Sequence, residues 1–350
     1  MQNPKQPPVS LVFFGSFLQY SASVLQALLD DGRFQVTAVV TTPPLIDKKK
    51  GMLKNPVHQL AEAYATPVCT PDTLTSQELQ KLTSEPSNYF LTAGYGKLLP
   101  QSWLEHPHIA SLNLHLSLLP HYRGANPAEW MLLRGERKAG VTLIEMSPQF
   151  DTGKMIAQSI VEIQPTDTRE TLYETLYTLG AREIGEMLQK YHHWHMREKE
   201  TLSHKINIQP GKNKNSDATQ YYLPPSPQPK AGVYARRLSR DDGYIQWSVL
   251  QKILSNQAVE SAEMPPLFAE VLQSLPIQEQ PALPKLVMRA TRALAGYPGL
   301  WTTIPTKKGK KRMKILEVSL KQNNQLVLEV VRIEGQNTAK WSEVKNGVIN

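Results

Sequence analysis

The segment Ser111–Ser117 reads Ser-Leu-Asn-Leu-His-Leu-Ser and alternates strictly between polar and apolar residues. A period of two predicts a β-strand whose leucines lie on one face and whose polar side chains lie on the other. Asn113 and His115 are two residues apart, so they share the polar face. Pro120 and Gly124 follow this segment, and both residue types are typical of turns. We therefore expect a strand that carries an amide and an imidazole toward its carboxyl end.

The regions upstream of this strand predict the fold class. Val9–Phe14 and Phe34–Val40 have the composition of buried strands, and Tyr20–Leu29 between them has a helical pattern. Such a strand–helix–strand unit predicts a parallel sheet with right-handed crossovers. Tyr89–Thr92 predicts a further strand of the same sheet. We therefore expect an α/β amino-terminal domain built on a doubly wound, mostly parallel, Rossmann-like sheet.

Two common kinds of cofactor site are not expected. A single glycine, Gly15, follows the first strand, which falls far short of the glycine-rich fingerprint of a nicotinamide site. Three histidines (His192, His193 and His195) follow a predicted long helix over Leu172–Lys190. Neighbouring side chains on a helix diverge, and no cysteine or acidic partner has ligand spacing, so we expect no metal.

The composition changes in the last third of the chain. Residues 203–230 are rich in proline and predict an extended, semi-rigid linker between a domain over 1–202 and a second domain over 231–350. Strands predicted over Tyr297–Ile304, Met313–Ser319 and Gln325–Ile333 indicate a small β-barrel of the OB-like type in that second domain. Residues 255–285, rich in Pro, Gln and Glu, read as an insertion to which the sequence assigns no role.

Length, charge and cysteine content narrow the class of protein. A chain of 350 residues predicts two domains, and its net charge of +8 is compatible with a polyanionic partner such as nucleic acid. A single cysteine, Cys69, allows no internal disulfide, which suits a reducing compartment. The start of the chain is polar and no apolar run approaches a membrane span, so we expect a cytoplasmic protein.

Basic residues concentrate in two segments that flank predicted strands. Each segment is either a solvated loop or a contact for phosphate groups, and the residues alone leave both readings open. The first segment lies in a loop predicted over Thr41–Pro56, and the second is the turn between two strands of the small barrel. Their members are Lys48, Lys49, Lys50 and Lys54 in the first segment, and Lys307, Lys308, Lys310, Lys311 and Arg312 in the second.

Asp151 in the loop Ser147–Gly153 completes a set of residues that suits acyl transfer. Asn113 can donate its amide hydrogens to an oxyanion, and His115 can carry a proton between an amine and a leaving group. An aspartate can orient the histidine and favour its charged form. The sequence offers no nucleophilic serine elbow or suitably placed cysteine. It therefore favours direct attack of one bound substrate on another, while a purely structural Asn–His pair remains the alternative.

Three spaced motifs resemble those of the folate-dependent formyltransferases. The first runs from Asn113 through His115, Ser117 and Pro120 to Arg123-Gly124-Ala125; the others are Gly140-Val141-Thr142 and Asp151-Thr152-Gly153. The family transfers a formyl group from 10-formyltetrahydrofolate to an amine on a doubly wound sheet. The resemblance implies that Asn113, His115 and Asp151 are catalytic. It also implies folate contacts by Ser117, Leu118, Leu119 and Pro120, and by the glycine-flanked loop Ala93, Gly94, Tyr95 and Gly96.

The carboxy-terminal part resembles the family members that act on methionyl-tRNA. The resemblance lies in Val233–Trp247 and in Arg289–Trp301, which contains Tyr297-Pro298-Gly299-Leu300-Trp301. It implies initiator Met-tRNA as the partner, with Arg123 and the two basic segments as tRNA contacts. We expect the protein to act as a monomer. The first basic segment has lysines where the family has arginines, which bind phosphate differently.

Two other functions remain open at this point. Formyltransferases that act on amino sugar nucleotides share some of the carboxy-terminal resemblance, whereas those acting on glycinamide ribonucleotide usually lack such a domain. A non-catalytic RNA-binding protein on the same scaffold is the alternative from a different class.

Overall fold

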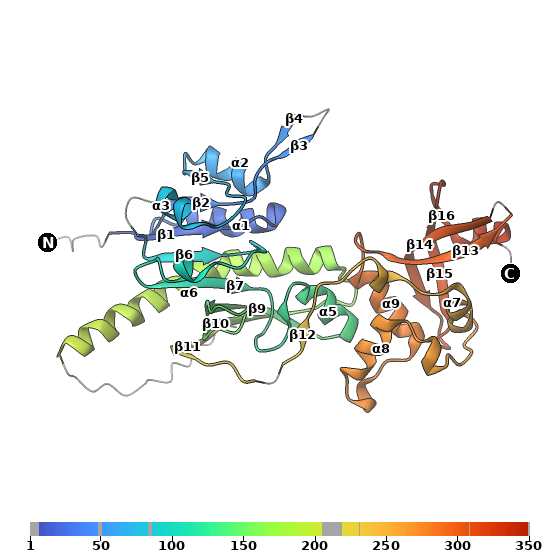
Figure 1. Ribbon diagram of the computed structural model, residues 1–350. Helices are drawn as coiled ribbons and strands as arrows, with labels where there is room; N and C mark the ends of the chain where they lie inside the picture. The colour runs from blue at the N-terminus through green and yellow to red at the C-terminus, as the bar shows by residue number, and fades with distance from the viewer. Residues whose placement is uncertain are drawn as a thin grey trace. The chain divides into compact units, whose positions relative to one another are not determined.

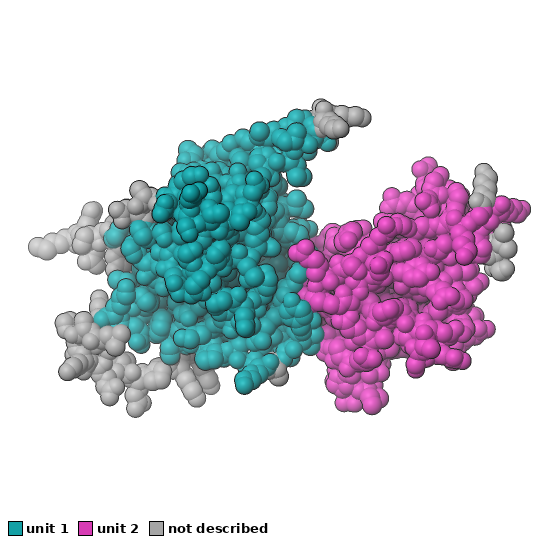
Figure 2. All heavy atoms as spheres, viewed as in Figure 1, with its two compact units in different colours: residues 1–125, 138–162, 173–234 teal, residues 126–137, 163–172, 235–350 magenta. Residues whose placement is uncertain are grey.

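The computed structural model describes residues 7–47, 51–82, 86–204, 219–230, 232–307 and 309–348. The chain forms two compact units, shown in different colours in Figure 2. The first comprises residues 1–125, 138–162 and 173–234, and the second comprises residues 126–137, 163–172 and 235–350. The second unit therefore includes two short pieces from the amino-terminal half. The predicted domains over 1–202 and 231–350, as functional divisions, stay a prediction.

The first unit is built on an eight-stranded sheet with the order β11-β10-β9-β7-β6-β1-β2-β5 (Figure 1). Strands β5, β2, β1, β6 and β7 are parallel neighbours, while β9, β10 and β11 join antiparallel. The doubly wound, mostly parallel sheet expected from the sequence is therefore confirmed. The strands are β1 (Val9–Phe14), β2 (Phe34–Val40), β5 (Val68–Cys69), β6 (Tyr89–Thr92), β7 (Ala110–His115), β9 (Lys138–Glu145), β10 (Met155–Glu162) and β11 (Thr219–Ser226).

Helices cover both faces of this sheet. A buried cluster on one face joins Val12 and Phe14 of β1 and Phe90 of β6 to α3 and α4. On the other face, Gly180 of α6 lies so close to Leu114 that an added Cβ atom would stand 2.7 Å from the leucine side chain. Leu114 of β7 therefore faces α6. The helices are α1 (Leu18–Leu29), α2 (Pro56–Ala63), α3 (Ser76–Leu82), α4 (Gln101–Leu104) and α6 (Arg169–His204).

Three segments of the first unit differ from the prediction. The loop predicted over Thr41–Pro56 contains a hairpin of β3 (Leu45–Asp47) and β4 (Gly51–Leu53), which extends away from the helices in Figure 1. Its apolar side chains are exposed, so no burial pattern marks it as a strand pair. The predicted linker contains β11, an edge strand; an edge tolerates its prolines because outward N–H groups need no partner. Helix α6 continues to His204, so the three clustered histidines lie inside it.

The second unit pairs helices with a four-stranded antiparallel sheet of order β13-β14-β15-β16. Its strands are β13 (Leu300–Thr306), β14 (Gly309–Leu320), β15 (Leu326–Ile333) and β16 (Thr338–Lys340). Its helices are α5 (Pro127–Arg134), α7 (Trp247–Leu254), α8 (Pro266–Gln273), α9 (Leu283–Ala293) and α10 (Trp341–Val344). The three predicted strands are present, and within the described residues they form this sheet where a small barrel was expected.

Residues 126–137 belong to the second unit because α5 packs on α9. The guanidinium of Arg289 donates to the carbonyl of Arg134 at 2.8 Å, and Arg134 donates to the carbonyl of Ser274. The stretch read as an insertion contributes α8, whose Leu267 and Phe268 are buried. It is therefore an integral part of the core of this unit.

Two short strands, β8 (Arg123–Gly124) and β12 (Tyr234–Ala235), complete the extended segments. Across the ranges that the structure describes, every helix is too short or too polar to cross a lipid bilayer.

Candidate active site

Asn113 lies at the carboxyl end of β7, beside Thr92 at the end of β6. The Thr92 hydroxyl donates to Asn113 Oδ1 at 2.6 Å, and Asn113 Nδ2 donates to Asp151 Oδ1 at 3.0 Å. The hydroxyl therefore occupies the acceptor end of the amide, and the donor end points at the carboxylate. One hydrogen of the Asn113 amide remains for a further acceptor.

His115 lies between a backbone carbonyl and the same carboxylate. Its Nε2 lies 2.8 Å from the carbonyl oxygen of Tyr122, and its Nδ1 lies 3.4 Å from Asp151 Oδ1. A carbonyl can only accept, so Nε2 carries a hydrogen and donates it. In the neutral ring this leaves Nδ1 as the nitrogen that can take up a proton. The side chains of His115 and Asp151 are only 8% and 9% exposed, so the pair interacts largely out of water.

Asp151 is held by the loop that follows β9. Its Oδ2 accepts a hydrogen bond of 2.9 Å from the backbone N–H of Gly124, and its own backbone has a φ of +54°. The loop is closed by a hydrogen bond of 2.8 Å between the hydroxyls of Ser147 and Thr152. A left-handed backbone is unfavourable for a non-glycine residue, so these contacts stabilise a strained conformation. The structure thus brings together the three residues singled out from the sequence.

Two of the four residues that were predicted to contact folate after β7, Ser117 and Leu119, are buried. The Ser117 hydroxyl is buried and donates to the carbonyl of His121 at 2.6 Å, and Leu119 is buried between β9 and β10. Leu118 and Pro120 are half-buried. The carbonyls of Ser117 and Leu119 accept hydrogen bonds from Thr142 and Gln158. Their folate contacts stay a prediction, in which Leu118 and Pro120 are the more accessible members.

The loop after β6 combines a buried tyrosine with two left-handed glycines. Ala93 and Tyr95 are buried, and within the described residues Tyr95 Oη has no hydrogen-bond partner. Burial, with a smaller contribution from Cys69, raises the pKa of Tyr95 to about 12. Gly94 and Gly96 have φ values of +69° and +76°, which favour glycine. The Tyr95 hydroxyl is therefore neutral and enclosed by the protein, with no hydrogen-bond partner among the described residues.

The basic residues predicted from the first segment are only partly described. Lys48, Lys49 and Lys50 lie outside the described residues, as does Lys308 of the second segment. Lys54 forms an ion pair with Glu62 at 2.6 Å. Arg123 donates to Gln228 Oε1 at 2.9 Å and to the carbonyl of Pro229 at 3.1 Å. These two cations are therefore engaged within the first unit.

Two residues of the second basic segment, Lys310 and Arg312, lie on one face of the four-stranded sheet. Lys310, Arg312 and Lys314 alternate along β14, and Arg332 of β15 is paired with Lys314. Trp301 of β13 is the other neighbour of Lys314, and the guanidinium of Arg312 lies 4.6 Å from the centre of its ring. Lys307 and Lys310 are exposed, and Lys311 donates to the carbonyl of Glu334. This face, called the basic face below, comprises Lys310, Arg312, Lys314, Arg332 and Trp301.

Sequence reasoning missed several of these residues. Thr92 was placed on a strand, and its contact with Asn113 follows from the adjacency of β6 and β7 in the sheet. Lys314 could have been found from the sequence, because the period of two in β14 places it on the same face as Lys310. Arg332 joins that face because it is paired with Lys314. Gln228 lay in the predicted linker and had no signal in the sequence.

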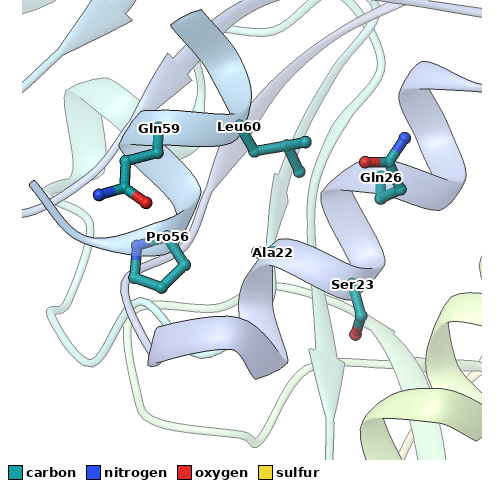
Figure 3. Close-up of a pocket in the computed structure, with 6 residues that line it drawn as sticks. All are labelled: Ala22, Ser23, Gln26, Pro56, Gln59 and Leu60. Carbon is teal, nitrogen blue, oxygen red and sulfur yellow. The ribbon is translucent and has the colours of Figure 1, made fainter. Parts of the chain in front are cut away.

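One further feature of the first unit lies outside this site. A shallow depression of about 470 Å³ between α1 and α2 is lined by Ala22, Ser23, Gln26, Pro56, Gln59 and Leu60 (Figure 3). None of these side chains is an acid or a base at neutral pH, so the depression offers no proton-transfer chemistry. The described ranges contain no group of three or more His, Cys, Asp or Glu side chains that could hold a metal ion.

Comparison with known proteins identifies similar sequences and folds. The Formyl transferase family matches residues 9–188. The chain is 37% identical over 185 residues to a methionyl-tRNA formyltransferase of Streptococcus sanguinis, covering 52% of this chain and 59% of that protein. It is 33% identical over 245 residues to a methionyl-tRNA formyltransferase of Gluconobacter oxydans, covering 68% and 69% of the two chains. A variant of HypX from Aquifex aeolicus shares the fold with a TM-score of 0.50, at 14% identity, over 99% of this chain and 49% of that one.

Proposed function

This chain belongs to the formyl transferase family, and from that premise we propose that it formylates the α-amine of methionine on initiator tRNA. The formyl donor in this proposal is 10-formyltetrahydrofolate. The carrying observation is the contact of Asp151 Oδ1 with both Asn113 and His115, which joins an oxyanion donor to a proton carrier. The match with the Streptococcus sanguinis methionyl-tRNA formyltransferase spans 59% of that protein's length and supports this choice of acceptor.

The described residues divide the reaction into three tasks. The free hydrogen of the Asn113 amide stabilises the negative oxygen that forms when the amine attacks the formyl carbon. His115 Nδ1 takes the proton from the attacking nitrogen, and Asp151 stabilises the imidazolium that results. When the bond between the formyl carbon and the donor nitrogen breaks, His115 returns the proton to that nitrogen. The proton is therefore conserved, and no covalent enzyme intermediate is needed.

The loop Ala93–Gly96 fits a planar, polar donor. When bound, the folate supplies an activated formyl group on nitrogen. The space beside Gly96 is open, since an added Cβ atom there would meet nothing within 4 Å, and this space leaves room for such a ring next to the loop. The Leu118–Pro120 segment would pack on its apolar surface. These residues therefore fit the co-substrate that the family resemblance implies.

The basic face supports a nucleic-acid acceptor. Four cations and a tryptophan share one surface of the antiparallel sheet, while its opposite surface is apolar and buried, for example at Met313 and Val331. Cations bind backbone phosphates, and an aromatic ring can stack on a base. The two basic segments, including Lys48, Lys49, Lys50 and Lys308, extend the proposed tRNA contacts. We further propose that the protein acts as a cytoplasmic monomer.

A formyl-transfer assay with two acceptors tests this function. Purified full-length protein is mixed with 10-formyltetrahydrofolate carrying a labelled formyl group, and with either Met-tRNA or an amino sugar nucleotide. We expect label on the methionine of the tRNA and none on the sugar. Transfer to the sugar alone would replace the proposed acceptor. Binding of tRNA without transfer to either acceptor would indicate a non-catalytic RNA-binding protein.

A further inference from the structure

Gln228 joins two loops of the candidate active site. Its Nε2 donates to the carbonyl oxygens of Asp151 and Gly153, each at 2.8 Å. Its Oε1 accepts from Arg123 Nε at 2.9 Å. Both ends of one side-chain amide are therefore bound, one to the loop after β9 and the other to the turn after β7. Gln228 itself follows the edge strand β11, so a third segment of the chain closes the site.

Arg123 completes this connection. Besides its contact with Gln228, its guanidinium donates to the carbonyl of Pro229 at 3.1 Å. The neighbouring Gly124 donates its backbone N–H to Asp151 Oδ2 at 2.9 Å, and Tyr122 presents its carbonyl to His115 at 2.8 Å. Arg123 thus lies in the chain directly between the two backbone groups that hold Asp151 and His115.

The two loops need such support because each contains a strained residue. Asp151 has a φ of +54° and Tyr122 a φ of +63°. Left-handed conformations of non-glycine residues persist only where surrounding contacts impose them. The Gln228 amide binds the carbonyl of Asp151 itself, and Arg123 adjoins Tyr122 in the chain. Loss of either contact would allow Asp151, Asn113 and His115 to move relative to one another.

We propose that Gln228 and Arg123 are positioning residues that fix Asp151 against Asn113 and His115. This inference rests on the proposed function, because it assigns the two residues to the same reaction. It gives Arg123 a role through the geometry of its guanidinium fork, whereas charge alone would suffice for a phosphate contact. Misplacement of reacting groups by about 1 Å lowers rates by up to about a hundredfold.

Gln228→Leu tests the inference by two independent readouts. We expect the kcat for Met-tRNA to fall about tenfold to a hundredfold, with the KM for tRNA within about twofold of wild type. Gly124 provides the second readout, because its amide donates to Asp151. Its protection from hydrogen exchange should fall about tenfold in the variant, measured by NMR without substrate.

Matched variants separate positioning from general damage. Gln220→Leu makes the same chemical change at an exposed position of β11 and should leave kcat and Gly124 protection unchanged. Gln228→Glu keeps the side-chain shape but presents a second acceptor to the two carbonyls, so it should lower kcat without unfolding the protein. Wild-type kcat and wild-type Gly124 protection in both Gln228 variants would overturn the inference.

Arg123→Lys separates fork geometry from charge. A lysine keeps the positive charge but cannot bridge Gln228 and Pro229 as a guanidinium does. We expect a lower kcat with an unchanged KM for tRNA. A raised KM with normal kcat would identify Arg123 as a tRNA contact and overturn its positioning role.

Different measurements test the positioning role of Gln228 and the proposed function, so the failure of one can be told from the failure of the other. If wild-type protein transfers no formyl group to Met-tRNA, the proposed function fails. The exchange of the Gly124 amide still reports whether Gln228 holds the Asp151 loop.

Discussion

Asp151 Oδ1 lies 3.0 Å from Asn113 Nδ2 and 3.4 Å from His115 Nδ1, so one oxygen atom contacts both groups. Its other oxygen is bound by the backbone of Gly124. The carboxylate therefore fixes the separation of Asn113 and His115, the proposed oxyanion donor and proton carrier. Five predictions follow from this arrangement and from the rest of the fold.

Removing either of the two groups that Asp151 contacts should abolish most of the activity. We expect Asn113→Ala and His115→Ala to lower kcat by about 10²–10⁴-fold with the fold intact, from typical oxyanion and acid–base contributions. Because the two act as a unit, the double variant should lose little more than either single one. His108→Ala, an exposed histidine, is the control. Wild-type rates in either single variant would refute the assignment.

Thr92 should matter through the orientation of Asn113. Thr92→Val keeps the shape but removes the hydroxyl that donates to Asn113 Oδ1, which frees the amide to rotate. We expect kcat to fall about tenfold, because a displacement of the Asn113 amide by about 1 Å or less is enough to slow the reaction. Thr92→Ser retains the hydroxyl and should keep most of the activity. Equal rates in the two variants would show that the hydroxyl has no positioning role.

Gly94 should be far less tolerant of a side chain than Gly96. Both have a positive φ, but a Cβ at Gly94 would overlap the Tyr177 hydroxyl and lie 2.8 Å from Ser21 Oγ, whereas a Cβ at Gly96 meets nothing within 4 Å. We expect Gly96→Ala to cost about 1 kcal/mol of unfolding free energy and Gly94→Ala about 3 kcal/mol. Urea unfolding of both variants measures the difference. Similar losses of unfolding free energy in the two variants would mean that Tyr177 and its neighbours rearrange around the added Cβ atom without strain.

Ionised Asp242 should stabilise the folded protein at pH values above the ordinary pKa of an aspartate, and this stabilisation should be lost at lower pH. Burial opposes ionisation, but hydrogen bonds from Arg236 and Ser239 prevail and lower the pKa of Asp242. A carboxyl whose folded pKa is depressed contributes stability above the unfolded value of about 3.9, and this is lost as pH falls through the folded pKa.

Asp242→Asn should therefore cost about 2 kcal/mol at pH 7, the magnitude of a hydrogen bond to a charged group. The difference from wild type should shrink as the pH falls below about 4. Urea unfolding followed by tryptophan fluorescence at several pH values checks this. A difference that stays constant down to pH 2 would contradict the proposed linkage.

The basic face should contribute to tRNA binding through phosphate contacts. Lys314→Ala should weaken binding and reduce the slope of log K against log salt by about one unit, as loss of a single phosphate contact does. Lys321→Ala removes the same charge at an exposed site after β14 and is the control. Binding titrations at several salt concentrations measure both. Equal slopes in the two variants would exclude Lys314 from the interface.

Strand positions were predictable where a continuous apolar run marks a buried strand. Val9–Phe14 and Tyr89–Thr92 have the predicted bounds because their apolar runs lie in a sheet covered on both faces. The hairpin of β3 and β4 and the edge strand β11 were not predictable in this way. The side chains of the hairpin are largely exposed and those of β11 are mostly half-buried, so neither shows the alternation of buried and exposed residues that marks a strand.

The sequence by itself determined the doubly wound sheet and singled out Asn113, His115 and Asp151 as candidate site residues, because periodicity and motif spacing are local properties. Only the tertiary structure decided that Thr92 orients Asn113 and that Gln228 and Arg123 hold the loop of Asp151. Only it decided that residues 126–137 belong with the second unit. These relationships join positions far apart in the chain, and their hydrogen bonds exist only once the sheet has brought the strand ends together.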